Sequence, residues 1–84
     1  MKRAAVYADI DAERAKQAEK WGGPHLWGAG DCSSRDVSDP VKAAVLAEEC
    51  GEVARAVLDS DPESLRNELI QVAAVAVAWL EALS

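Results

Sequence analysis

The chain has 84 residues with a net charge of −6, and half of the residues are hydrophobic, 17 of them alanine. This length allows one small domain, so we expect residues 1–84 to form a single unit. The Ala-rich composition favours packed helices over a sheet. The acidic balance argues against a nucleic-acid polymer as partner, because proteins that bind one neutralise its phosphates with clustered Lys and Arg.

The first predicted helix runs from about Ile10 to Lys20, with Asp9 as its N-cap and a start that can extend back to Ala4. It ends at Trp21-Gly22-Gly23-Pro24, a strong helix breaker. The segment from Trp21 to Asp39 is predicted to be a loop. Because it contains two Trp, and disordered segments are poor in aromatic residues, we expect a functional loop.

The second and third predicted helices begin with the same device. Asp39 and Asp61 are the expected N-caps, and each is followed by a proline at the first helical position, where its missing N–H costs nothing. The second helix runs to about Leu58 and the third to about Leu83. The connection between them is short, so we expect an antiparallel helical hairpin.

The third helix is predicted to be apolar almost all round between Leu69 and Leu80, broken only by Gln71. A helix of this kind is buried on every side, and three helices are too few to enclose it. We therefore expect a homodimer or homotetramer in which the helices assemble into a four-helix bundle. The apolar stripe of this helix consists of Leu65, Leu69, Val72, Ala76, Trp79, Leu80 and Leu83.

Nothing in the chain resembles an export signal or a membrane span. The longest apolar run, Val72 to Leu80, has nine residues, whereas a bilayer needs about 20. Cys32 and Cys50 lack CxxC spacing and are typical of reduced thiols. These features indicate a cytoplasmic protein that does not contact a membrane.

Carboxylates interrupt the apolar face of the second helix. Glu49 and Glu52 fall within its apolar stripe and Glu48 lies at the border, while Glu68 flanks the stripe of the third helix. Buried carboxylates are costly unless they are paired or bind a cation. If they converge across the hairpin, they can hold Mg²⁺ or Mn²⁺, which prefer oxygen ligands. The alternative is that Glu48 and Glu49 are solvated and Glu52 pairs with Arg55.

Two segments together resemble a known family. Glu48-Glu49-Cys50-Gly51-Glu52 is followed sixteen residues later by Glu68-Leu69-Ile70-Gln71. This pattern resembles the EExxE…ExxD signature of the MazG-like, all-α nucleotide pyrophosphohydrolases, as does Lys20-Trp21-Gly22 at the end of the first helix. The resemblance covers roughly residues 10 to 83, and the stretch from Glu68 to Ala76 looks like the short bacterial and phage members of the family.

The resemblance implies Mg²⁺-dependent hydrolysis of a nucleoside triphosphate, often a deoxynucleotide, to monophosphate and pyrophosphate by a dimer or tetramer. Glu49 and Glu52 would be catalytic. The implied metal ligands are Glu48, Glu49, Glu52, Glu68 and Gln71. Gln71 replaces the Asp of the signature, and its neutral amide can ligate a cation but cannot act as a base.

Three residues are candidates for contacts with the nucleotide. Lys20 can meet the phosphates, and Trp21 and Trp27 can stack on the base. Their structural alternatives are a surface lysine and two indoles that pin the loop to the core. The competing interpretation of the whole chain is a non-catalytic helical module that binds nucleotide or a protein partner, which Gln71 and the short chain favour.

Overall fold

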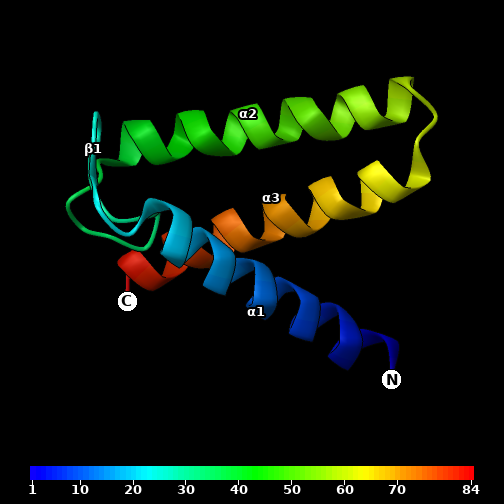
Figure 1. Ribbon diagram of the computed structural model, residues 1–84, viewed down its shortest axis with the longest axis horizontal. Helices are drawn as coiled ribbons and strands as arrows, with labels where there is room; N and C mark the ends of the chain where they lie inside the picture. Colours follow the sequence, from blue (N-terminus) through cyan, green and yellow to red (C-terminus); the bar gives the residue numbers. More distant parts are fainter.

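The computed structural model describes residues 1–84 and consists of three long helices with one small hairpin (Figure 1). The elements are α1 (Lys2–Trp21), β1 (Pro24–His25), β2 (Gly28–Ala29), α2 (Asp39–Leu58) and α3 (Pro62–Ala82). The predicted all-α architecture is therefore confirmed in outline, with a two-stranded antiparallel sheet added inside the predicted loop. No helix combines the length and the apolar character that crossing a bilayer requires.

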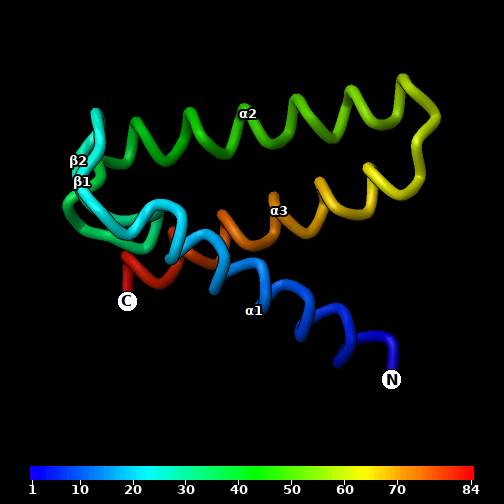
Figure 2. Tube along the Cα trace, in the orientation of Figure 1, coloured from blue at the N-terminus to red at the C-terminus, as the bar shows by residue number.

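α2 and α3 form the predicted antiparallel hairpin, and α1 packs on α3 near the end opposite the turn (Figure 1). Asp61 caps α3 as predicted, because its side chain accepts a hydrogen bond from the Ser64 N–H at 3.1 Å. Ser60 takes a left-handed conformation in the turn, with φ of 54°. The path of the chain through this turn and through the hairpin strands is clearest in the trace (Figure 2).

The start of α1 and the cap of α2 differ from prediction. α1 begins at Lys2, because residues 2–9 contain good helix formers and no breaker, so Asp9 lies within the helix and is not its cap. α2 is capped by Ser38, whose hydroxyl accepts from the Val41 N–H at 3.4 Å. Asp39 is the first residue of α2, and its carboxylate accepts a hydrogen bond from the Trp79 indole at 3.0 Å.

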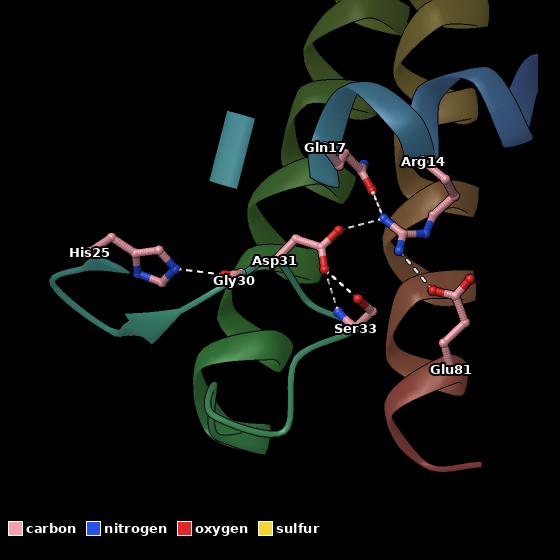
Figure 3. A network of polar contacts seen from close by, with 7 residues as sticks. All are labelled: Arg14, Gln17, His25, Gly30, Asp31, Ser33 and Glu81. Atoms are coloured by element: carbon pink, nitrogen blue, oxygen red, sulfur yellow. Dashed lines mark hydrogen bonds and ion pairs between the residues drawn. The ribbon is translucent and has the colours of Figure 1, made fainter. Parts of the chain in front are cut away.

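The loop between α1 and α2 is fastened by a network of polar contacts centred on Arg14 and Asp31 (Figure 3). Arg14 donates to Asp31 at 2.6 Å and to Glu81 at 2.7 Å, so α1, the loop and α3 are tied together at one guanidinium. Asp31 also accepts from the backbone N–H and the hydroxyl of Ser33. The Arg14 and Asp31 side chains are only 12% and 6% exposed, so this pair is enclosed, whereas Glu81 is 51% exposed.

Very little of the single chain is buried. The buried apolar residues are Val37, Ala56, Ala74, Val75 and Ala78. Ala74 and Ala78 are completely enclosed, and their small side chains let the neighbouring helices approach α3 closely. The radius of gyration is 13.2 Å, whereas a compact chain of this length has a value of about 12 Å. The chain is thus more open than a compact domain of the same length.

The predicted apolar stripe of α3 is not the face of the helix that the single chain encloses. Leu69, Leu80 and Leu83 are 50%, 63% and 67% exposed, and the enclosed face of α3 is instead the one that carries Ala74, Val75 and Ala78. In the single chain, therefore, the helix is covered on one side only. Leu69, Leu80 and Leu83 share one face because residues 11 and 14 positions apart in a helix lie almost in line.

Candidate functional site

Three glutamates converge between α2 and α3, and we call Glu49, Glu52 and Glu68 the glutamate cluster. Glu49 and Glu52 are three positions apart on α2 and so share a face, and Glu68 approaches from α3. One carboxylate oxygen from each lies within 4.8 Å of the other two. Ligands of Mg²⁺, each about 2.1 Å from the ion, sit roughly 3 to 4 Å apart, so a small side-chain movement would close the cluster around such an ion.

Two oxygens of the glutamate cluster are buried without a hydrogen-bond partner. They are one Oε atom each of Glu49 and Glu68, and neither receives an N–H or O–H from the protein. A buried carboxylate oxygen that accepts nothing is energetically costly. A proton or a cation shared by the carboxylates would remove that cost.

The electrostatics of the cluster favour proton uptake when no cation is bound. Burial, followed by the negative charges of Glu52 and Glu68, raises the pKa of Glu49 to about 7. Burial also raises the pKa of Glu68, and a hydrogen bond and the charge of Glu52 add to that effect. A divalent cation at these oxygens would compete with the protons, because carboxylate ligands bind a cation in their deprotonated form.

Two further glutamates act on the cluster from outside it. Glu48 is exposed and does not belong to the three converging carboxylates, but its charge contributes to the raised pKa of Glu49. Glu13 of α1 contributes to the raised pKa of both Glu49 and Glu68. Sequence reasoning missed Glu13, because no spacing within α1 links it to residues on α2 or α3.

Two hollows border the glutamate cluster. The α1–α3 groove has a volume of about 340 Å³ and is lined by Asp9, Ala12, Glu13, Lys16, Arg66, Asn67, Ile70 and Gln71. The α2–α3 hollow has a volume of about 260 Å³ and is lined by Glu52, Arg55, Ala56, Asp59, Asp61, Ser64 and Glu68. Glu52 and Glu68 line the hollow itself, and Asn67 and Gln71 of the groove flank Glu68 along α3.

The sequence-predicted metal ligands are therefore distributed over three places. Glu49, Glu52 and Glu68 form the glutamate cluster. Gln71 is half-buried and lines the α1–α3 groove. Glu48 points to solvent beside the cluster, so a cation held by the three converging carboxylates would leave Glu48 free.

The three predicted nucleotide contacts lie at the end of α1 and in the hairpin loop. The Lys20 ammonium is 5.3 Å from the centre of the Trp21 ring, a cation–π arrangement. His25 meets the Trp21 ring edge to face, and its Nε2 lies 2.7 Å from the Gly30 carbonyl (Figure 3). Trp21 and Trp27 remain 41% and 55% exposed. Neither tryptophan lines the groove or the hollow.

Gly28 helps to set the shape of this hairpin loop. Its φ is 132°, and a Cβ at this position would lie 2.4 Å from the Asp36 carbonyl oxygen. Glycine is therefore required for the close approach between β2 and the chain that leads to α2.

Comparisons of the chain with protein-family models, with curated proteins and with solved structures found no match. The chemistry of the glutamate cluster and of the two hollows beside it is thus the basis for assigning a function.

Proposed function

We propose that the protein is a metal-dependent hydrolase that cleaves a nucleoside triphosphate into a monophosphate and pyrophosphate, with the glutamate cluster as its cation site. The observation that carries the cation site is the pair of buried, unpartnered oxygens on Glu49 and Glu68. An all-carboxylate ligand set suits Mg²⁺ or Mn²⁺. The reaction itself is the one that the resemblance to the MazG-like pyrophosphohydrolases implies.

In this proposal, Glu49, Glu52 and Glu68 hold the cation. A bound Mg²⁺ or Mn²⁺ would neutralise phosphate oxygens and orient the attacking water. Glu49 and Glu52 are the predicted catalytic residues, as the resemblance implies, and both belong to the cluster. Glu48, exposed and outside the ligand set, is a further carboxylate that can accept the proton of the water.

The oligomer belongs to the same proposal. Leu69, Leu80 and Leu83 form an exposed apolar stripe along α3, and Val6 and Tyr7 add exposed apolar surface on α1. Exposed patches of this kind mark protein interfaces. We place a second copy of the chain on the α3 stripe, which would complete a four-helix bundle. The free thiols Cys32 and Cys50 fit a reducing compartment such as the cytoplasm.

The test is pyrophosphate release from a panel of deoxynucleoside and nucleoside triphosphates with Mg²⁺, with Mn²⁺ and with chelator. We expect release that requires the metal and that disappears in Glu49→Gln. Glu19→Gln is the matched control, because Glu19 is an exposed helical glutamate outside the cluster. Absence of release from every nucleotide by a folded, metal-binding oligomer would reject the hydrolase.

One feature favours a second candidate, a non-catalytic module that binds nucleotide or a protein. Gln71 supplies a neutral amide at the position where the signature has a carboxylate, so the ligand set lacks one charge. Such a module would bind a nucleotide with its metal and leave it intact. Calorimetric binding of a triphosphate without pyrophosphate release would identify it.

A further inference from the structure

The two hollows beside the glutamate cluster differ in the charge that they present. The α2–α3 hollow combines four carboxylates with a single base, Arg55, which is already 3.8 Å from the carboxylate of Asp59. The α1–α3 groove has two carboxylates and two bases. An anion that approaches the cluster is therefore repelled on the side of the hollow and meets no net charge in the groove.

The two bases of the groove remain available to a ligand. Arg66 donates to Asp9 at 2.6 Å through one Nη atom, and its side chain is 57% exposed, so its other N–H groups can bind phosphate oxygens. Lys16 forms no ion pair with any carboxylate of the protein. A lysine at the wall of a groove with no acidic partner is a suitable contact for a phosphate group.

The rest of the groove suits an anion that extends from the cluster. Asn67 and Gln71 present neutral amides that can donate hydrogen bonds without repelling phosphate. Asn67 directly precedes Glu68 on α3, and Gln71 lies about one turn beyond Glu68 on the same side of the helix, so the groove adjoins the cluster. The volume of about 340 Å³ lies within the range of about 300–1,000 Å³ typical of small-molecule sites.

We propose that the α1–α3 groove binds the polyphosphate chain of the substrate, with Lys16 and Arg66 as phosphate contacts. This inference rests on the proposed cation site, since the cation would join the phosphates to the glutamate cluster. It gives the neutral Gln71 a role, because a carboxylate at that position would add negative charge to a groove that receives an anion. It also places the phosphates between α1 and α3, away from the α2–α3 hollow.

The experiment uses inorganic tripolyphosphate with Mg²⁺ as the probe, in isothermal titration calorimetry on the full chain. We expect Lys16→Ala and Arg66→Ala each to weaken binding about tenfold, and Lys16→Glu to weaken it further. Arg55→Ala is the matched control, because it removes a base from the other hollow, and it should change the affinity less than twofold. Arg66→Lys, which keeps the charge, should retain most of the affinity. Circular dichroism verifies that each variant is folded.

A separate titration with Mn²⁺ alone distinguishes this inference from the proposed function. If Lys16→Ala and Arg66→Ala bind both Mn²⁺ and tripolyphosphate like the parent protein, the groove assignment is wrong and the cation site stands. If the parent protein binds no Mn²⁺, the cation site is wrong; binding of tripolyphosphate that depends on Lys16 would still support an anion groove. Equal weakening by Arg55→Ala, or absence of tripolyphosphate binding in the parent protein, would overturn the inference.

Discussion

The Arg14 guanidinium lies 2.6 Å from the Asp31 carboxylate, and both side chains are almost fully enclosed. Burial by itself would raise the pKa of Asp31, but the hydrogen bonds from Ser33 and Arg14 outweigh it and hold the pKa below its ordinary value. The carboxylate is therefore stabilised in its charged form, and it fixes the loop to α1.

Replacement of Asp31 by Asn is expected to destabilise the protein by about 2–4 kcal/mol, because it leaves a buried guanidinium with one fewer charged partner. Asp9→Asn is the matched control. Asp9 also lies 2.6 Å from an arginine, but its pair with Arg66 is about half exposed, so its loss should cost less than about 1 kcal/mol. Urea unfolding followed by circular dichroism measures both effects at pH 7. Equal losses in the two variants would show that burial does not decide the strength of these pairs.

Stability should fall with rising pH in the absence of a divalent cation. The pKa of Glu49 in the folded protein, about 7, lies above its ordinary value, so the folded state binds more protons than the unfolded state between these two values. The stabilisation is complete below the ordinary carboxyl pKa and is lost as the pH rises through 7. The expected decrease in unfolding free energy between pH 5 and pH 8 is up to about 3 kcal/mol.

Thermal unfolding in chelator at a series of pH values provides the measurement. Glu49→Gln should flatten the profile between pH 5 and pH 8, since its amide does not titrate. Saturating Mg²⁺ should raise the melting temperature more at pH 8 than at pH 5, because the cation competes with the proton for the same oxygens. A parent profile that is flat over this range would contradict the raised pKa of Glu49.

Glu48 and Glu68 should differ in their effect on cation binding, although both fall in the motif that resembles the MazG-like signature. Glu68→Gln removes one charged oxygen from the glutamate cluster and should weaken Mn²⁺ binding by roughly tenfold or more. Glu48 lies outside the cluster, so Glu48→Gln should weaken it by about threefold at most, the effect of one screened charge nearby. Mn²⁺ titration followed by electron paramagnetic resonance reports the affinity directly. An equally large loss in Glu48→Gln would place that residue among the ligands.

The exposed stripe of α3 should be the contact between copies of the chain. We expect the parent protein to be at least a dimer and Leu80→Glu to shift it toward the monomer, because a buried carboxylate opposes association. Leu26→Glu is the control, since Leu26 is 85% exposed but lies in the hairpin loop. Size-exclusion chromatography with light scattering gives the masses. A parent protein that runs at the 8.9 kDa of one chain at micromolar concentration would reject the oligomer.

Local chemistry in the sequence was sufficient to place α2, α3 and the end of α1, but not the start of α1. Asp61 and Pro62 start α3 as predicted, and Gly22 with Gly23 and Pro24 ends α1 close to the expected position. Caps, breakers and helical spacing act over a few residues, so the printed sequence contains them in full. The same reasoning placed Glu49 and Glu52 on one face of a helix, because residues three apart are always neighbours there.

The tertiary structure alone decided which side chains meet between helices. Ser38 and Asp39 are both residue types that favour the N-cap; in the structure Ser38 caps α2, and Asp39 accepts a hydrogen bond from the distant Trp79. The same holds for the site. The approach of α2 and of α1 to α3 brings Glu68 to Glu49 and sets Glu13 and Arg66 on a shared groove. Such contacts depend on how whole helices pack and cross, and no spacing within one helix encodes that.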